Sequence, residues 1–345
     1  MRFDTLRQKI TDYCEANQIF GMLRVTVGGK IEYTQTMGFA DIEKKIPFSD
    51  DSMFTFYSLS KPFCALGLLK LKDKGLVNLD DHPGKYVPEA KGFDERVTIR
   101  QMLQHISGLP DFEQNAEFAA KYAPGLVSKT REHMKLLTAY PNYFEPGTAG
   151  RYTNINFVLS ALIIENVSGM QYADYMKQEV FEPLGMKTAV VDNEDLFIPN
   201  RVQGYDLQDG VPVPVEKWRD WAIGAGDIVG TLDDVYCLNL AIKNRLLLKP
   251  ETWEEALIPT PVNKKALGST VIPWHGKHRI FHNGGHKGFR TLHLQLPEDD
   301  FDIILLSNSG YGDARNDLIE FIYEAFYGED GALVEKMDMD TGYIR

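Results

Sequence analysis

The sequence predicts an α/β protein of the α+β kind, in which an antiparallel sheet is flanked by N- and C-terminal helices and a mainly helical domain is inserted. Strand-like runs occur near both ends of the chain, and helix signals dominate the stretch between them. We therefore expect three parts, which are a discontinuous sheet domain of residues 1–57 and 227–328, a helical domain of residues 58–226, and a C-terminal tail of residues 329–345.

The N-terminal part is predicted to form a helix followed by a β-hairpin. Apolar residues recur at helical spacing over residues 3–18. Two strand-like runs follow at 22–27 and 31–37, and the Gly28-Gly29-Lys30 segment between them is typical of a hairpin turn. Residues 38–53 are polar and are predicted to be a loop.

The remaining elements follow from the same patterns. Helices are predicted at residues 60–74, from 98 onward, at 156–167, at 171–180 and, as the closing element, at 318–327. Proline, glycine and aspartate are frequent between 187 and 227, which predicts loops. Strands are predicted at residues 270–274, 279–282, 291–296 and 302–307.

Composition and charge exclude several functional classes. The chain has 345 residues and a net charge of −12 without a basic run, which disfavours nucleic acid and anionic membranes as partners. No apolar stretch reaches the ~18 residues of a membrane span. The three cysteines, Cys14, Cys64 and Cys237, are scattered and suggest neither a disulfide framework nor a metal site. The first residues lack the apolar core of a signal peptide, so a native start at Met1 predicts a cytoplasmic protein.

The candidate nucleophile is Ser58 in the segment Phe54–Phe63. Lys61 follows three residues later, so a helix would place the hydroxyl and the amine on one face. A serine hydroxyl needs a neighbouring base, and burial can keep a lysine neutral near pH 7 for that purpose. Pro62 fits only in the first turn of a helix, which puts Ser58 at or just before a helix N-terminus. The alternative is a capping serine followed by a surface lysine.

A second stretch could supply a proton carrier. In Phe144–Asn154, Tyr152 could move protons between Ser58 and a leaving group, and Asn154 could hydrogen-bond the substrate and Lys61. Tyr140-Pro141-Asn142 has the same Tyr-x-Asn spacing, but a turn precedes Tyr152 and a helix follows it. The alternative for an isolated Tyr-x-Asn is a core tyrosine beside a helix-capping asparagine.

A third stretch, Phe281–Phe289, could supply an oxyanion site. A strand that runs into glycines lets its backbone approach a ligand, so the N–H groups of Gly285 and Ser58 could hold an oxyanion. His282 and Gly284 would contact the substrate. The His-x-Gly pattern also occurs at His82 and His286, so it is weak alone.

The same region allows a metal-site hypothesis. The four histidines His275, His278, His282 and His286 lie within twelve residues, and zinc favours such clusters. The neighbouring glycines and β-branched residues favour strand and turn, which would spread these side chains apart. No metal and no cofactor are therefore predicted.

Taken in order, these motifs resemble the serine β-lactamase and penicillin-binding-protein superfamily, on its class C and esterase side. The resemblance rests on Ser58-x-x-Lys61, Tyr152-x-Asn154 and His282-x-Gly284, together with connecting segments that are also similar. Those segments are Gly38-Phe39-Ala40-Asp41, Leu103–Pro110, Phe181–Met186 and Gly284–Phe289, so the similarity covers roughly residues 15–325. Three ordered motifs are far more specific than any one of them.

The resemblance implies a β-lactamase/transpeptidase-like fold and an acyl-enzyme on Ser58. It implies Lys61 and Tyr152 as the base pair and Asn154 as a substrate contact, with a structural role for His105. His282 stands where class C β-lactamases carry lysine, and relatives that act on cell walls are exported. Both features favour a cytoplasmic esterase, D-peptidase or amidase that acts on a small-molecule ester or amide.

Two alternative functions stay open at this point. An acyltransferase would use the same acyl-enzyme and pass the acyl group to an alcohol or amine. A non-catalytic ligand-binding or sensor protein would keep the fold without turnover, although the intact Ser58, Lys61 and Tyr152 speak against it. The chain contains no Gly-x-Ser-x-Gly, which disfavours an α/β-hydrolase.

Overall fold

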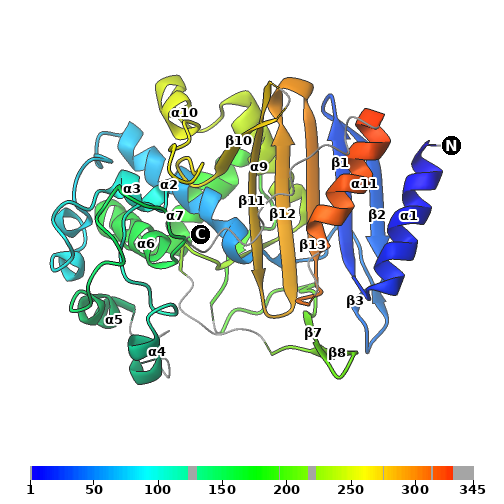
Figure 1. Cartoon of the computed structure of the whole chain (residues 1–345), viewed down its shortest axis with the longest axis horizontal. Helices are drawn as coiled ribbons and strands as arrows, with labels where there is room; N and C mark the ends of the chain where they lie inside the picture. Colours follow the sequence, from blue (N-terminus) through cyan, green and yellow to red (C-terminus); the bar gives the residue numbers. More distant parts are fainter. Residues whose placement is uncertain are drawn as a thin grey trace.

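The centre of the protein is a six-stranded antiparallel sheet in the order β10-β11-β12-β13-β1-β2 (Figure 1). The computed structural model describes residues 2–122, 130–193, 195–216, 223–274, 276–311 and 314–328. In sheet order, the strands are β10 (Thr270–Trp274), β11 (Lys277–His286), β12 (Phe289–Leu296), β13 (Phe301–Ser307), β1 (Gly21–Val27) and β2 (Lys30–Met37). The predicted fold class is confirmed.

Strands from the two ends of the chain meet in the middle of this sheet. β13 pairs with β1 in the register Leu305 to Leu23, and β1 pairs with β2 through the predicted hairpin. Successive residues face opposite sides, as the period of a strand requires. On β11, Ile280 packs into the core beneath the helices, whereas Phe281 packs into the core on the other side. By the same alternation, His282 and Gly284 face the helical side.

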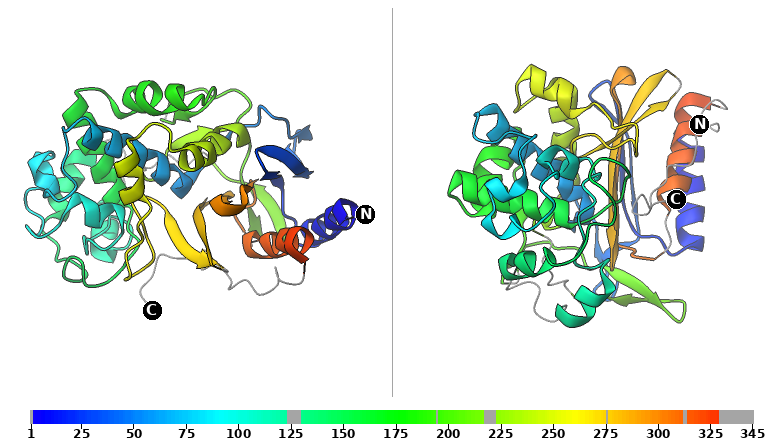
Figure 2. Two further views of the ribbon diagram at one scale, coloured as in Figure 1. Left: turned by 90° about the horizontal axis from the view of Figure 1, so that it is seen from above. Right: turned by 60° about the vertical axis from the view of Figure 1, so that its left-hand side comes forward.

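Two terminal helices cover one face of the sheet, as predicted. They are α1 (Arg2–Ala16) and α11 (Arg315–Tyr327), which lie side by side (Figures 1 and 2). Leu6 and Ile10 of α1 and Leu318 and Ile322 of α11 are buried in one core with the sheet residues that face them. Apolar area removed from water stabilises a fold by roughly 25 cal/mol per Å², so the burial of these side chains holds the two chain ends together.

The helical part covers the opposite face of the sheet (Figure 2). Its longest helices are α2 (Ser60–Asp73) and α6 (Ile155–Ser168), which are almost wholly buried and pack against each other. The other helices are α3 (Ile99–Leu103), α4 (Ala116–Tyr122), α5 (Thr130–Leu137), α7 (Tyr172–Met176), α8 (Glu182–Leu184), α9 (Leu232–Asn244) and α10 (Pro250–Ala256). α9 packs directly on β12 and β13.

Several short strands lie where loops were predicted. β3 (Phe39–Asp41) pairs with β4 (Ile46–Pro47) within 38–53, and β6 (Val190–Val191), β7 (Tyr205–Gln208) and β8 (Val211–Pro214) lie within 187–227. β6 joins β9 (Ile228–Gly230) and β5 (Phe54–Thr55) in a small sheet. These strands have two to four residues, too few for an alternating pattern, and prolines are tolerated at the sheet edge in β8. The loop predictions were wrong here.

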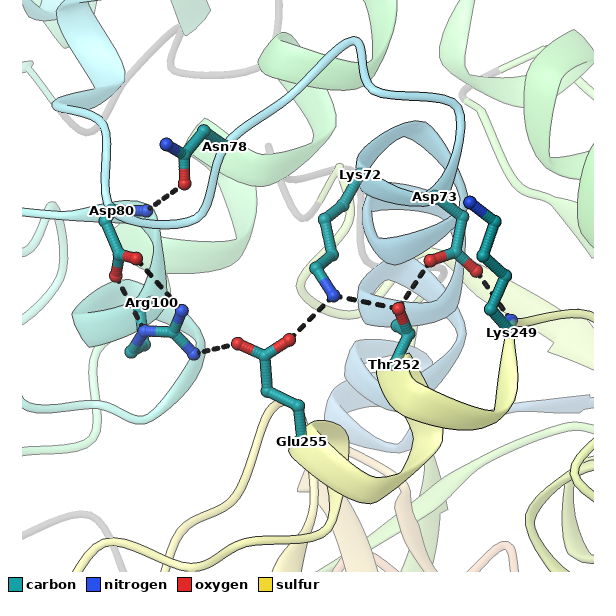
Figure 3. Close-up of polar contacts among 8 residues, drawn as sticks. All are labelled: Lys72, Asp73, Asn78, Asp80, Arg100, Lys249, Thr252 and Glu255. Atoms are coloured by element: carbon teal, nitrogen blue, oxygen red, sulfur yellow. Dashed lines mark hydrogen bonds and ion pairs between the residues drawn. The ribbon is translucent and has the colours of Figure 1, made fainter.

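Polar contacts tie α10 to α2 and α3 (Figure 3). The Lys72 ammonium lies 2.7 Å from a Glu255 carboxylate oxygen and donates to Thr252 Oγ1 at 2.8 Å. Arg100 bridges the other Glu255 oxygen to Asp80, at 2.8 Å from the Arg100 Nε to the Asp80 Oδ1. The sequence did not predict α9 or α10.

No helix in the described part of the chain is both long and apolar enough to cross a bilayer. The division into a sheet domain and an inserted helical domain stays a prediction. The predicted tail, residues 329–345, lies outside the described residues.

Candidate active site

Ser58 lies in a 3₁₀ turn, η1 (Tyr57–Leu59), directly before α2. This confirms the position inferred from Pro62, which lies in the first turn of the helix. Ser58 is partly exposed, whereas its neighbours on both sides are buried. Tyr57 has a left-handed backbone with a φ of 48°, and its hydroxyl donates to the Lys287 carbonyl at 3.1 Å. Strain of this kind is tolerated where the surroundings hold it, and it presents Ser58 at the surface of the core.

The Lys61 side chain is fully buried and points at Ser58. Its Nζ lies 2.9 Å from Ser58 Oγ, 2.9 Å from Asn154 Oδ1 and 2.7 Å from the Ala225 carbonyl. Burial lowers the pKa of Lys61 to about 7, although Asp111 and Glu113 act in the opposite direction. Near neutral pH, a large share of this amine is therefore unprotonated and able to accept a proton.

The Ala225 carbonyl belongs to a loop that ends at β9. Gly224 N–H donates to Asp227 Oδ2 at 2.9 Å, which closes the loop around Ala225. Gly224 has a φ of 70°, and a Cβ there would meet the Phe157 carbonyl at 2.6 Å. Burial of the carboxyl oxygens raises the pKa of Asp227 to about 7. No motif in the sequence identified this third acceptor for Lys61.

Asn154 and Asp111 have different roles at the start of α6. Asn154 directly precedes the helix but makes no capping bond with its side chain, which instead reaches Lys61. The buried Asp111 carboxylate accepts the backbone N–H groups of Asn154 and of Ile155, the latter at 3.0 Å. Asp111 thus satisfies the helix N-terminus and leaves the Asn154 amide for the site. The capping-asparagine alternative is wrong in this respect.

Tyr152 completes the group around Ser58. The Lys61 Nζ lies 4.8 Å from the centroid of the Tyr152 ring. Burial raises the pKa of Tyr152, while Ser58, which faces the hydroxyl, lowers it by a smaller amount. The hydroxyl forms no hydrogen bond of standard geometry with the described residues. The competing Tyr140 packs instead on Phe118, with 5.7 Å between ring centroids.

His105 packs against the ring of Tyr152. The two rings stack with centroids 4.3 Å apart. The His105 Nδ1 accepts the Thr153 N–H at 3.3 Å and lies 3.3 Å from Asn156 Nδ2, so the ring proton belongs on Nε2. Burial and the positive charges of Lys265 and Lys61 lower the pKa of His105 well below its usual value. His105 is therefore a neutral support for Tyr152.

Gly284 brings β11 against the serine turn. A Cβ at Gly284 would lie 2.1 Å from the Phe56 carbonyl oxygen and 3.0 Å from the Leu59 nitrogen. Thr291, its partner on β12, donates to the same Phe56 carbonyl at 2.8 Å. Gly285, the next residue, is exposed. Only glycine allows this approach of β11 to the serine turn.

His282 is buried on the face of β11 that looks toward Tyr152. The two ring centroids are 6.4 Å apart. The His282 Nδ1 lies 2.7 Å from the Asn283 carbonyl, which can only accept, so Nδ1 carries the proton. Burial and the charges of Lys265 and Lys61 lower the pKa of His282 well below its usual value. His282 thus offers a substrate hydrogen bonding but no positive charge.

The described histidines of the predicted cluster do not lie close to one another. His278, His282 and His286 follow each other at four-residue intervals along β11, a spacing of roughly 13 Å in a strand. His278 pairs with Glu298, and the His286 ring meets Tyr57 edge-on. His275 lies outside the described residues. Among the residues that the structure describes, no group of three could hold a metal ion.

A sequence profile of the family described as Beta-lactamase matches residues 6–325. Among curated proteins, the chain is 31% identical to penicillin-binding protein 4* of Bacillus subtilis strain 168, over 89% of this chain and 70% of that protein. It is 26% identical to the protein flp of Staphylococcus aureus strain MW2, over 82% of this chain and 58% of that protein. The chain thus spans about 60 to 70% of these relatives.

Solved structures share the fold. The octameric penicillin-binding protein homologue from Pyrococcus abyssi superposes with a TM-score of 0.81 at 23% identity, over 96% of this chain and 79% of that one. The D-amino acid amidase from Ochrobactrum anthropi SV3 superposes with a TM-score of 0.80 at 25% identity, over 94% of this chain and 99% of that one. A class C β-lactamase gives 0.77 at 22% identity, with 97% of each chain covered.

Proposed function

Because the chain belongs to the Beta-lactamase family, we propose that it is a metal-free serine hydrolase that acts on small esters or amides through an acyl-enzyme. The observation that carries this proposal is the buried Lys61 amine, 2.9 Å from Ser58 Oγ and with a pKa of about 7. A nucleophile and a base within hydrogen-bond reach are what acyl transfer to serine requires.

Ser58 Oγ forms a bond to the substrate carbonyl carbon while its proton passes to Lys61 Nζ. The carbonyl electrons move to oxygen, and the resulting oxyanion lies between the N–H groups of Ser58 and Gly285. The raised pKa of Tyr152 keeps its hydroxyl protonated at neutral pH. The intermediate collapses when the carbonyl re-forms and the bond from its carbon to the leaving oxygen or nitrogen breaks. Tyr152 is therefore the donor to that leaving atom, and it regains a proton from Lys61.

Water then attacks the acyl carbon of the acyl-enzyme, and its proton passes through Tyr152 to Lys61. The new bond joins the water oxygen to the acyl carbon, the bond to Ser58 Oγ breaks, and the serine recovers its proton. Asn154 holds Lys61 in reach of Ser58 throughout, since its Oδ1 accepts from Lys61 Nζ. No step uses a cofactor.

Amides of D-amino acids and short acyl esters are the substrates to test first. The amidase among the structural relatives supports the former class, and the partly exposed serine supports the latter because a small acyl group can reach it directly. The unprotonated Nε2 of His282 accepts a hydrogen bond without charge, so a neutral substrate is compatible with the third motif.

The test is turnover of acetyl and butyryl nitrophenyl esters, D-alanyl amides and nitrocefin by the wild type and by Ser58→Ala. We expect Ser58→Ala to lower turnover by roughly 10³-fold or more. A fluorophosphonate probe followed by mass spectrometry should place the adduct on Ser58. No adduct on Ser58, together with no turnover of any compound, would contradict the proposal and favour the non-catalytic alternative.

A further inference from the structure

A carboxyl group that the mechanism does not use lies on the turn that presents the Ala225 carbonyl to Lys61. Gly224 N–H donates to Asp227 Oδ2 at 2.9 Å. Ala225 lies between these two residues in the chain, and its carbonyl accepts from Lys61 Nζ at 2.7 Å. The position of the carbonyl that contacts the amine therefore depends on the Asp227 carboxyl.

Two further hydrogen bonds fix the backbone of this turn. The Ile228 N–H donates to Ser60 Oγ at 3.0 Å, and Ser60 is fully buried in the first turn of α2. The Asp227 carbonyl accepts the N–H of Asp192 at 2.7 Å. Asp227 is thus held in place relative to the helix that carries Lys61.

The Asp227 carboxyl has little compensation for its burial. Its Oδ1 is buried and forms no hydrogen bond of standard geometry with the described residues. Burial raises the pKa of Asp227 to about 7, although the Gly224 N–H and the charge of Lys61 act in the opposite direction. A neutral amide would close the same turn at a smaller cost of desolvation, so a carboxyl here points to a role for its charge.

Lys61 supplies the positive charge that acts on this carboxyl. The other ionisable groups that face it among the described residues are Cys64 on α2, Tyr172 on α7 and Asp192 after β6. Burial lowers the pKa of Lys61, and acidic groups that include Asp227 oppose this effect. Of the others, Asp111 is bonded to the N-terminus of α6, and Glu113 is exposed.

We propose that Asp227 is a positioning residue for Lys61, which holds the Ala225 carbonyl in place and stabilises the ammonium that forms when Lys61 accepts the Ser58 proton. The inference rests on the proposed function and deepens it. Opposite charges attract several-fold more strongly in a buried site than in water. The aspartate of a serine–histidine–aspartate triad likewise orients its base and stabilises the protonated form. Asp227 acts through Lys61 rather than on the substrate.

NMR titration of isotope-labelled lysine measures this effect without turnover, and Lys61→Met identifies the Lys61 signal. Asp227→Asn keeps an oxygen acceptor for Gly224 N–H but removes the negative charge. The protonated amine is then less stable, so the Lys61 midpoint should fall by at least about half a pH unit. Asp195→Asn removes an exposed carboxylate and should leave the midpoint unchanged. A wild-type midpoint in folded Asp227→Asn, or an equal fall in Asp195→Asn, would overturn the proposal.

Kinetics tests the consequence for Ser58. In Asp227→Asn, the rise of kcat/KM for a nitrophenyl ester should move to lower pH by the same amount, and its value above about pH 8 should fall by roughly threefold. Asp227→Ala also releases the turn and should lower that value by roughly tenfold more. An unchanged pH profile in Asp227→Asn would mean that the carboxyl only closes the turn, which contradicts the proposal. A lowered Lys61 midpoint without turnover of any ester would support Asp227 and contradict the hydrolase proposal alone.

Lys61→Met gives the reciprocal measurement if Asp227→Asn does not fold. Loss of the nearby amine should raise the midpoint of the Asp227 carboxyl, followed by NMR of isotope-labelled aspartate, by at least about half a pH unit. Thermal melts show which variants are folded. An Asp227 midpoint that is the same in the wild type and in Lys61→Met would rule out the coupling on which the proposal depends.

Discussion

The two ends of α2 carry two lysines with opposite surroundings. Lys61, at the N-terminal end, is fully buried, and its three bonding partners are a hydroxyl, an amide and a carbonyl. Lys72, three turns later, has a side chain that is 24% exposed and pairs with the Glu255 carboxylate at 2.7 Å (Figure 3). The same residue type on one helix is thus placed once among neutral acceptors and once against a charge.

The difference separates a chemical role from a structural one. A buried ammonium without a directly bonded carboxylate loses hydration that its neutral partners do not fully replace, so its pKa falls to about 7. A partly exposed ammonium beside a carboxylate forms an ion pair that ties two helices together.

The largest effect is expected from substituting the two lysines in parallel. Lys61→Met removes the base for Ser58 and should lower kcat/KM for a nitrophenyl ester by roughly 10³-fold. Lys72→Met should change it less than about twofold, since Lys72 contacts none of the residues around Ser58. Steady-state kinetics measures both, with thermal melts to show that each variant is folded. Comparable losses in the two variants would mean that Lys61 acts through the fold.

Removal of the Tyr152 hydroxyl should have the next largest effect. Tyr152→Phe keeps the ring that stacks on His105 but removes the proton donor, so kcat should fall by roughly 10²-fold. The loss should be smaller for nitrophenyl esters than for amides, because a nitrophenolate leaves without protonation. Tyr140→Phe is the control and should be close to wild type. An equal loss on both substrate classes would contradict the assignment of Tyr152 as donor to the leaving group.

The pH profile should show the titration of Lys61. The lowered pKa means that the amine is protonated and inactive below about pH 7 and neutral and active above it. We therefore expect kcat/KM to rise roughly tenfold between pH 6 and pH 8. The Lys72→Met variant should show the same midpoint. A profile that is flat across this range, or that falls as pH rises through 7, would be incompatible with Lys61 as the base.

The smallest effect concerns the stability supplied by the Lys72 cluster. Lys72→Met or Glu255→Gln should lower the free energy of unfolding by about 0.5–1 kcal/mol, because the pair is partly exposed and screened by salt. The two changes together should cost less than their sum. Urea denaturation at low and high salt measures this, with kcat/KM unchanged. A loss several times larger would show that this pair contributes as much to the free energy of unfolding as a buried ion pair.

Much of the site could be predicted because its residues are separated by short, regular spacings. Ser58 and Lys61 share a helical turn, and Pro62 indicates where that turn begins. Tyr152-x-Asn154 could be preferred over Tyr140-Pro141-Asn142 only because a turn precedes it and a helix follows it. The roles of Gly285 and His282 in substrate binding remain predictions.

Other parts of the site could not be found from spacing. The Ala225 acceptor is a backbone carbonyl, which any residue could provide. Asp111 caps α6 from more than forty positions away, and Lys265 follows an ordinary lysine, Lys264, from which the sequence does not distinguish it. Only a folded chain reveals which of two adjacent lysines is buried.

The amino-acid sequence alone determined the fold class, the family and the three residues that meet at the site. These can be read from the periodicity of each segment and from the order of short motifs along the chain. The tertiary structure decides the protonation states. Burial makes Lys61 a base, keeps Tyr152 protonated and makes His282 neutral, and burial depends on segments that are far apart in sequence and are packed together by the folded core.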